Sequence, residues 1–321
     1  MIDAVARERI TCAQTQARAG LDSVYARVAV NDADRPPRRH APPHVGRERD
    51  RLGDVARREV DLDHELRLDV GVHRHAWTIA LALLVTGCQA DLGDVDNAFF
   101  TWDARKVHCA VDLDASARNS LASIDTGLDR AKERGEVLEL YAHHPGVTLS
   151  WSTIEHVLAG AQERGLAFLT YADLVHGAAP GPGLLLSFDD SWVDAWTQGR
   201  PLFQQYGARV TFFIAYYPRF TDGEKTELRE LAGDGHDVEA HTISHQRGPA
   251  YVEAHGLRAY LDDEVVPSIE LLRDDGYEVT TFAYPFGSRT AETDRAILRH
   301  VSQLRSVSFA ISGIDESPCP Y

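Results

Sequence analysis

The sequence predicts an α/β fold, a distorted (β/α) barrel of seven to eight strands, over residues 106–321. Short apolar runs alternate there with amphipathic segments, which is the pattern of βαβ units around a parallel sheet. Eight such runs fit within roughly 210 residues, a length that suits a single compact barrel. In barrels of this kind the functional groups lie at the carboxyl ends of the strands, so the polar residues that follow an apolar run are candidates for a site.

Each expected strand is a short apolar run, and each expected helix is an amphipathic segment between two such runs. The strands are expected at 107–113, 137–142, 166–171, 184–188, 209–215, 236–241, 279–284 and 305–311. The helices are expected at 115–134, 152–164, 192–206, 223–233, 257–275 and 291–300. The strand that begins at Leu184 is the most distinctive, because its apolar run is typical of a buried strand and ends in two adjacent carboxylates.

The residues before this pattern differ from it in composition. Residues 1–69 have no sustained apolar face, so we expect them to be disordered or not to belong to the natural protein. Residues 70–88 have the layout of a lipoprotein-type signal segment, in which a short basic stretch precedes the apolar run 76–85. The sequence that closes it, Val-Thr-Gly-Cys, resembles a lipobox and makes Cys88 the expected lipidation site. Residues 89–105 are expected to form a linker.

Signal segments lie at true N-termini, so this interpretation places the start of translation at Val70 or Val72. The apolar run is too short to span a bilayer, and a buried hydrophobic helix is the alternative interpretation. With the signal, the protein is expected to be exported to the bacterial cell envelope, or released outside the cell. Membrane contact is then expected only through a lipid at Cys88.

The four cysteines and the net charge limit which metal sites, disulfides and binding partners are expected. Cys12, Cys88, Cys109 and Cys319 include no Cys-x-x-Cys pair, so a thiolate zinc site is not expected. In an oxidising compartment we expect a disulfide between Cys109 and Cys319, with two separate buried thiols as the alternative. The formal net charge of -16 argues against a nucleic-acid partner, whose phosphates would be repelled.

Two short motifs together indicate a metal site. Asp189 and Asp190 end one expected strand, and His241 and His245 follow another about fifty residues later. Two imidazoles and one carboxylate are the ligand types that hold a divalent ion such as zinc, and three protein ligands leave a position open for water or substrate. The second carboxylate is then free to accept a proton from that water.

At these residues the sequence resembles the polysaccharide deacetylase family, also described as the NodB-homology domain or carbohydrate esterase family four. Ser187-Phe-Asp-Asp190 is similar to its first motif, His241-Thr-Ile-Ser-His245 to its second, and Ala283-Tyr-Pro-Phe-Gly287 to its third. The resemblance implies a distorted barrel, with Asp189 as the base and with Asp190, His241 and His245 as ligands of a divalent metal, most readily Zn²⁺.

The resemblance also implies a site for the developing oxyanion at a backbone N–H near Pro285 and Phe286. One departure is that the arginine which meets the base in the third motif is Ala283 here. Two interpretations stay open: another cation, such as Arg289, compensates, or the base is tuned differently. Trp192 and Tyr216 are expected substrate contacts, because sugar rings stack on aromatic faces. The other nearby aromatic side chains are expected to pack in the core: Trp196, Tyr217, Tyr284 and Phe286.

The family's last motif does not follow the strand at 305–311, and a similar block lies upstream instead. Residues 135–146, which include His143 and His144, and then residues 164–174 resemble that block. We therefore expect a circular permutation in which the strand at 305–311 neighbours the strand at 107–113, as barrel closure permits. His143 is then the expected acid in preference to His144, because adjacent strand residues face opposite ways.

Asp112 and Asp114 are expected to stand in for the family's fourth motif. The function that this resemblance implies is metal-dependent hydrolysis of acetyl groups on an N- or O-acetylated carbohydrate. Two alternatives remain at this point. One is a glycan-binding envelope lipoprotein without catalysis, and the other is an amidase acting on a small C–N substrate.

Overall fold

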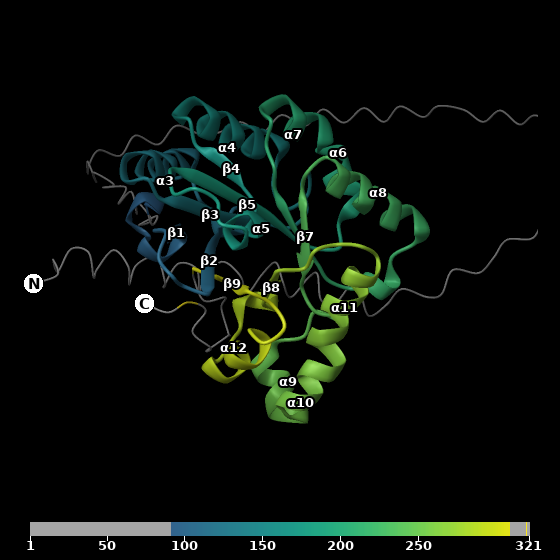
Figure 1. Cartoon of the computed structure of the whole chain (residues 1–321). Helices are drawn as coiled ribbons and strands as arrows, with labels where there is room; N and C mark the ends of the chain where they lie inside the picture. Colours follow the sequence, from purple (N-terminus) through teal and green to yellow (C-terminus); the bar gives the residue numbers. More distant parts are fainter. Residues whose placement is uncertain (1–90, 309–318, 320–321) are drawn as a thin grey trace, which may run out of the picture. The chain divides into compact units, whose positions relative to one another are not determined.

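The structure is a computed structural model that describes residues 91–308 and Cys319. Seven parallel strands close into a barrel in the order β2-β9-β8-β7-β6-β5-β3, and β3 pairs with β2 to complete the ring (Figure 1). These strands are β2 (Val107–Asp112), β3 (Val137–Ala142), β5 (Gly183–Asp190), β6 (Thr211–Ile214), β7 (Asp237–Ala240), β8 (Thr281–Ala283) and β9 (Gln303–Val307). The predicted α/β barrel is confirmed.

Two short strands pair with strands of the barrel but are not part of the closed ring. β1 (Phe99–Phe100) runs antiparallel to the first residues of β3, and β4 (Ala167–Leu169) runs parallel to the first residues of β5. β9 pairs with β2 from Val107–Leu304 to Ala110–Val307. The last described strand therefore lies beside the second, as the sequence predicts.

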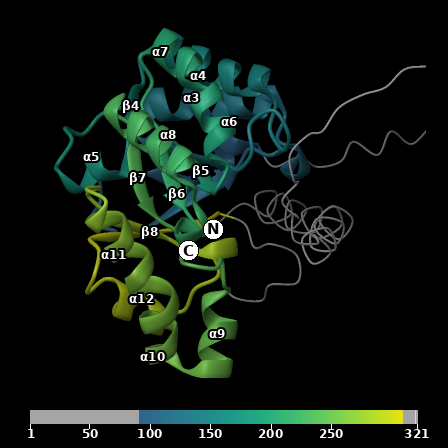
Figure 2. The ribbon, with the colours of Figure 1, turned by 90° about the vertical axis from the view of Figure 1, so that its right-hand side faces the viewer.

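Helices cover the outside of the barrel (Figures 1 and 2). They are α3 (Leu121–Arg134), α4 (Trp151–Arg164), α5 (Tyr171–Val175), α6 (Val193–Gln198), α7 (Arg200–Tyr206), α8 (Asp222–Gly233), α9 (Gly248–His255), α10 (Leu257–Tyr260), α11 (Val266–Asp274) and α12 (Ala291–Ile297). The two longest begin at a serine whose hydroxyl accepts a backbone N–H three residues on, and both end at a glycine with positive φ. These are standard start and stop signals of helices.

Two expected helices are interrupted. The segment 192–206 divides at Gly199, where a Cβ atom would lie 2.8 Å from the Phe203 ring and 3.0 Å from Trp151, so the close approach of these side chains requires glycine. The segment 257–275 contains a π-helical turn, Leu261–Val265, between α10 and α11. Turns of this type are frequent at functional sites.

The expectation that residues 89–105 are a linker does not hold from Asp91 onward. Leu92 and Phe99 are fully buried, and the Arg130 guanidinium lies 4.0 Å from the centre of the Phe99 ring. The expected signal segment with Cys88, the preceding residues 1–69 and Cys12 lie outside the described residues. Within residues 91–308, no helix has both the length and the apolar character that a membrane crossing requires.

The barrel interior contains polar side chains, because successive residues of a strand face the helices and the interior in turn. On β3 the side chains of Leu138 and Leu140 pack with the helices, while Glu139 is fully buried among other polar groups. Tyr171 Oη donates a hydrogen bond to the Glu139 carboxylate (2.9 Å), and His108 Nδ1 lies 3.0 Å from its other oxygen. Because a buried carboxylate requires such partners, this network fixes the interior beneath the site.

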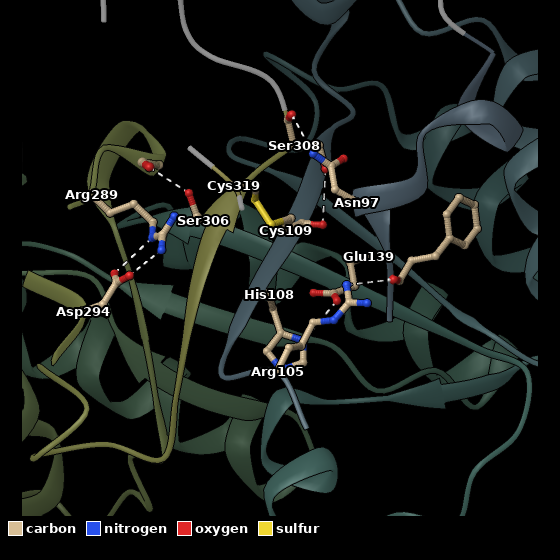
Figure 3. Close-up of a disulfide and its surroundings, with 12 residues drawn as sticks. Asn97, Arg105, His108, Cys109, Glu139, Arg289, Asp294, Ser306, Ser308 and Cys319 are labelled. Atoms are coloured by element: carbon tan, nitrogen blue, oxygen red, sulfur yellow. Dashed lines mark hydrogen bonds and ion pairs between the residues drawn. A yellow bond between two sulfur atoms is a disulfide. The ribbon is translucent and has the colours of Figure 1, made fainter. Parts of the chain in front are cut away.

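A disulfide joins Cys109 on β2 to Cys319, 210 residues later (Figure 3). Both cysteines are about 2% exposed. The Ser308 hydroxyl donates a hydrogen bond to the Cys109 carbonyl oxygen, and Asn97 Nδ2 donates one to the Ser308 carbonyl oxygen (3.3 Å each). The end of β9, the strand β2 and the segment before β1 are thus tied together at one place.

Candidate active site

A pocket of about 150 Å³ opens at the carboxyl ends of the barrel strands. Its lining brings together five of the residues that the sequence singles out for chemistry: His143, Asp189, Asp190, His241 and His245. They come from the ends of β3, β5 and β7 or from the loops that follow. A more open hollow of about 700 Å³ lies at the amino ends of β8 and β9. We assign the site to the smaller pocket, because it holds the convergent titratable groups.

The two carboxylates reach the same pocket because the backbone turns at the end of β5. Successive strand residues point to opposite faces, so a regular strand would direct Asp189 and Asp190 apart. Asp190 instead has φ of 84°, in the left-handed region that residues other than glycine seldom adopt. Backbone strain of this kind is stored mainly at functional sites. Asp189 is 2% exposed and therefore lies deeper in the barrel than Asp190, which is half-buried.

Asp190, His241 and His245 form a group whose ligand atoms lie within 4.8 Å of one another. Asp190 Oδ1 lies 3.2 Å from His245 Nε2 and 3.9 Å from His241 Nε2. The Nδ1–H of His241 donates to the Ala283 carbonyl oxygen (2.9 Å), which leaves its Nε2 as the lone-pair nitrogen facing the carboxylate. Buried Asp190 Oδ1 accepts no hydrogen bond from any described residue.

The protonation of the two histidines suits a metal. Burial, and next the neighbouring His245, lower the pKa of His241 well below its ordinary value. Burial also lowers the pKa of His245, against the pull of Asp190. Neutral imidazoles and a carboxylate with an unused oxygen are the donor set that a borderline divalent cation takes. These three residues therefore fit a divalent metal ion.

The loop that carries His245 is held by Glu264 in the π-helical turn. The Glu264 carboxylate accepts hydrogen bonds from the backbone N–H (2.8 Å) and the hydroxyl of Ser244, and its carbonyl oxygen accepts the N–H of Ile243 (3.1 Å). Glu264 is 5% exposed. Thr242 and His245 in the same loop have φ of 68° and 57°. Glu264 thus stabilises a strained loop that positions the His245 imidazole of the candidate metal group.

Replacing Glu264 with Ala is expected to lower the free energy of unfolding by about 1–3 kcal/mol, because two partly buried donors of Ser244 lose their acceptor. Urea denaturation of the wild type and of E264A measures the change. E264Q is the matched control, since its amide oxygen keeps one acceptor. Equal stability of E264A and the wild type would contradict a stabilising role for this contact.

Asp189 forms a buried ion pair with Arg305 on β9. Arg305 is 1% exposed, and its guanidinium lies 4.8 Å from the centre of the Phe213 ring and 5.0 Å from that of Tyr141. The expectation that Arg289 takes this position is wrong, because the Arg289 guanidinium forms an ion pair with Asp294 instead. The other oxygen of Asp189, Oδ1, is buried without a hydrogen-bond partner among the described residues.

His143 is oriented by Asp114, the residue that follows β2 by two positions. His143 Nδ1 lies 2.7 Å from Asp114 Oδ2, and Thr148 donates its hydroxyl hydrogen to the other oxygen (2.8 Å). Burial alone would lower the pKa of His143, but the hydrogen bond to Asp114 and the charges of Asp190, Asp114 and Asp112 outweigh it and raise the pKa to about 10. The imidazole is thus a proton carrier at neutral pH.

Asp112 lies within the same cluster as Asp114 and His143. Burial, and next the charge of Asp114, raise the pKa of Asp112 to about 7. One of its oxygens accepts the backbone N–H of Asp114 (2.8 Å). Asp112 therefore shapes the turn that carries Asp114, while Asp114 makes the contact with His143.

Of the two predicted aromatic substrate contacts, Trp192 lines the pocket and Tyr216 is not in its lining. Of the two residues predicted near the oxyanion, Phe286 lines the pocket and Pro285 does not. The Phe286 ring lies 4.7 Å from the His245 ring, and Tyr216 lies 6.2 Å from the same ring, between centroids. Both Phe286 and Tyr216 have φ near 60°. Of the aromatic residues expected to pack in the core, Trp196, Tyr217 and Tyr284 are buried, whereas the Phe286 side chain is half-buried and lines the pocket.

Gly287, the last residue of the stretch that resembles the third motif, lines the pocket, and the sequence did not predict a role for it. Its φ is 66°, and a Cβ atom there would lie 2.4 Å from Val307 Cγ2. The Ser306 hydroxyl donates a hydrogen bond to its carbonyl oxygen (2.7 Å). Only glycine can bring the loop after β8 this close to β9, so Gly287 sets the position of Phe286 at the pocket.

Residues 176–303 match the family model described as polysaccharide deacetylase. The chain is 27% identical over 120 residues to the putative polysaccharide deacetylase YxkH of Bacillus subtilis (strain 168), which covers 35% of this chain and 40% of that protein. It is 32% identical over 104 residues to a gellan lyase of a Bacillus species, with 32% of this chain and 4% of that protein covered. The chain thus spans less than half the length of each of these relatives.

Solved structures that match part of the chain include IcaB from Ammonifex degensii, with 22% identity and a TM-score of 0.42. They also include the Streptococcus pyogenes deacetylase PplD in complex with acetate, with 19% identity and a TM-score of 0.40. Each comparison covers 51% of this chain and 78% of the other. The family match begins after β3 and includes Asp189, Asp190, His241 and His245, so residues 176–303 of this chain are similar to the polysaccharide deacetylase family.

Proposed function

We propose that this protein is a metal-dependent hydrolase that removes acetyl groups from an N- or O-acetylated carbohydrate. The observation that carries the proposal is the convergence of a carboxylate base, three metal-ligand side chains and a charged imidazole on one pocket: Asp189, Asp190, His241, His245 and His143. This set contains every group that hydrolysis of an acetyl amide or ester needs.

In the proposed mechanism Asp190, His241 and His245 hold the ion, which we propose to be Zn²⁺. When bound, it polarises the acetyl carbonyl and lowers the pKa of a water. Asp189 accepts the proton of the attacking water through Oδ1, the oxygen that accepts no hydrogen bond from a described residue, while Arg305 holds the other oxygen. One oxygen of Asp189 thus fixes the position of the carboxylate, and the other accepts the proton.

His143 then protonates the leaving nitrogen or oxygen of the sugar, with Asp114 stabilising the imidazolium. A backbone N–H near Phe286 stabilises the oxyanion in the proposal, because Phe286 lines the pocket beside His245. The main reason to favour a glycan-binding protein without catalysis is that Ala283 replaces the motif arginine. The ion pair between Arg305 and Asp189 argues against this alternative, because the base still has a cation beside it.

We also propose that the chain is a circular permutation of the family's barrel. The support is that β2 and β3, which come early in the chain, lie between the last described strand, β9, and the motif-bearing strand β5. With β2 and β3 appended after β9, the order along the chain would follow the order around the wall. The permutation brings His143 to the pocket from outside the segment that matches the family model.

Export of the protein is a related proposal. The Cys109–Cys319 disulfide is the support, because structural disulfides persist in oxidising compartments. Cell fractionation followed by mass spectrometry of the N-terminal peptide tests it, and a lipid on Cys88 is the expected result. Recovery of the full chain, unmodified, from the cytosol would contradict export.

Acetate release tests the proposed activity. Purified protein is incubated with chitin oligomers, peptidoglycan and acetylated xylan, before and after treatment with a chelator and after zinc is restored. We expect acetate from at least one of these substrates, loss of the activity with chelator, and recovery with zinc. Absence of acetate from all three in the zinc-loaded protein, or activity that survives complete metal removal, would reject the proposal.

The fall of kcat/KM at alkaline pH is expected to follow the deprotonation of the catalytic acid. Since the pKa of His143 is raised to about 10, the acid stays protonated at neutral pH, and kcat/KM falls as the pH rises through the folded-state pKa. D114N removes a charge-assisted hydrogen bond that contributes about 1.5–3 kcal/mol, so the limb moves to lower pH by roughly one to two pH units. An unchanged limb in D114N would show that another group is the acid.

A further inference from the structure

We propose that Trp196 is a positioning residue for the acid: its indole N–H holds the backbone carbonyl oxygen of His143 and thereby sets where the imidazole stands in the pocket. This inference rests on the proposed function, in which His143 protonates the leaving atom. From the sequence, Trp196 is expected only to pack in the core. Three observations carry the further role: the hydrogen bond itself, the burial of the indole, and the contacts that hold the other polar groups of His143.

The hydrogen bond joins two segments that leave neighbouring strands. β3 and β5 are parallel and paired, with Ala142 opposite Phe188 in the last pair of their register. β3 is followed by the loop 143–149, here called the acid loop, and β5 continues into the two aspartates of the pocket and then α6. From α6, Trp196 Nε1–H donates to the His143 carbonyl oxygen (3.1 Å). The backbone of the acid loop is therefore linked to the segment that carries the proposed base.

The indole is a firm support because the core holds it. Trp196 is fully buried, and its ring stacks on Phe212 of β6, with 4.9 Å between centroids and an interplanar angle of 26°. A buried indole N–H needs an acceptor, and the His143 carbonyl oxygen is the acceptor in this fold. The start of α6 contacts the acid loop as well, since the Trp192 ring stacks on His144 with 4.1 Å between centroids. The two segments are thus joined at two places.

Asp114 holds the other polar groups of His143. The backbone N–H of His143 donates to Asp114 Oδ1 (3.3 Å), and Nδ1 lies 2.7 Å from Oδ2. The Thr148 hydroxyl donates to Oδ1 (2.8 Å) and accepts the backbone N–H of His144 (3.0 Å). With the carbonyl oxygen bound by Trp196, Nε2 is the polar atom of His143 that is left for a substrate. Asp114 thus fixes the orientation of the ring, and Trp196 fixes the backbone from which the ring extends.

The position of the acid decides its rate contribution. A general acid has to come within about 2.6–3.2 Å of the leaving atom, and a displacement of about 1 Å can cost roughly 10²-fold in rate. Phenylalanine in place of Trp196 keeps an aromatic ring against Phe212 but has no N–H, so the His143 carbonyl oxygen loses its donor. We expect the acid loop to shift in W196F. The loss should then fall on substrates whose leaving atom needs a proton.

The leaving group of the substrate separates the acid step from the rest of the site. An amide nitrogen or a sugar oxygen needs a proton to leave, whereas 4-nitrophenolate leaves without one. Zinc-loaded protein is assayed on chitin oligomers, peptidoglycan and acetylated xylan, and on 4-nitrophenyl acetate. The readout is the ratio of kcat/KM for the sugar substrate to kcat/KM for the ester. This ratio is expected to fall by about 10²–10⁴-fold in H143A and by roughly tenfold in W196F.

Two further variants isolate the indole N–H. W151F is the matched control, because it removes an indole N–H that makes no hydrogen bond with any described residue, and it should keep the wild-type ratio. The second variant carries 3-benzothienylalanine at position 196, where sulfur replaces the N–H and the ring keeps its size. It should lower the ratio as W196F does, and it replaces W196F if urea denaturation shows that variant to be unfolded in the assay.

The double variant W196F/H143A tests whether Trp196 acts through His143. If it does, W196F lowers the ratio in the wild type but causes no further fall in H143A. A Trp196 that only stabilises the fold would instead lower kcat/KM on the sugar substrate and the ester alike. It would also lower both in H143A.

The outcomes separate this inference from the proposed function. A ratio that falls with loss of the N–H, stays constant in W151F and falls no further in the double variant supports the positioning role. If H143A lowers the ratio and the variants at position 196 do not, the positioning role is refuted and the deacetylase function stands. If wild type releases no acetate from any of the sugar substrates, or if H143A keeps the wild-type ratio, the proposed function itself fails in its substrate or in its acid.

Discussion

Replacing Asp189 with Asn is expected to reduce kcat by about 10²–10⁴-fold, the range that general acid–base catalysis contributes. The amide has the shape of the carboxylate but cannot accept the proton of the attacking water. Its oxygen can still accept a hydrogen bond from Arg305, but Arg305 loses its buried counter-charge, so urea denaturation has to show that the variant is folded under the assay conditions. The variant tests chemistry apart from positioning, since Asp189 Oδ1 accepts no hydrogen bond from any described residue in the wild type.

The metal content of the same variant makes the prediction specific. Asp190, His241 and His245 form the metal-ligand group without Asp189, so D189N should bind zinc as tightly as the wild type in a competition titration with a chromogenic chelator. D190N is the matched control, because it changes the neighbouring carboxylate, and it should lose both zinc and activity. Retained turnover in D189N, or loss of its zinc, would refute the division of roles between the two aspartates.

Much of the barrel follows from the sequence because its signals are local. The apolar runs that predict eight strands correspond to β2–β9, and the strand 184–188 ends in the carboxylates that the structure places in the pocket. The family resemblance supplied the order of the strands around the wall. That order predicts that His143 lies near Asp190 although the two are far apart along the chain, and both residues line one pocket.

The features that the sequence did not predict depend on contacts between distant segments. The apolar pattern placed Arg305 at the start of a strand at 305–311, but β9 spans Gln303–Val307 and has Arg305 in its middle, facing inward. With the strand placed at 303–307, the sequence would have shown a charged residue in the middle of a buried strand. Such a residue is a signal of a functional or paired group. The bend at Gly199 and the packing of Leu92 likewise depend on neighbours that no local pattern shows.

The partner of His143 illustrates the same limit. Asp112 and Asp114 were expected near the site, but the sequence could not choose between them, because the choice depends on how the chain turns after β2. The turn directs Asp114 to Nδ1 of His143 and uses Asp112 to accept a backbone N–H. Positive φ angles at Asp190 and His245 are also invisible in the sequence, since they occur at residues other than glycine.

Removing Arg305 is expected to have the largest effect on stability. R305M leaves the Asp189 carboxylate buried without its cation, and breaking one side of a buried ion pair typically costs about 3–5 kcal/mol. Methionine fills similar space with a flexible apolar chain, so the loss arises from charge rather than from a cavity. Activity should fall as well, because Asp189 loses the contact that fixes one of its oxygens.

A double-mutant cycle separates the ion pair from other effects of the substitution. Urea denaturation of wild type, R305M, D189N and the double variant gives the coupling energy between the two side chains. Because D189N with R305M removes both charges, the double variant should be more stable than R305M alone. Coupling near zero would mean that Arg305 acts only through its packing on Phe213 and Tyr141. The base would then be positioned without help from a cation, and the replacement of the motif arginine by Ala283 would be a real loss in this chain.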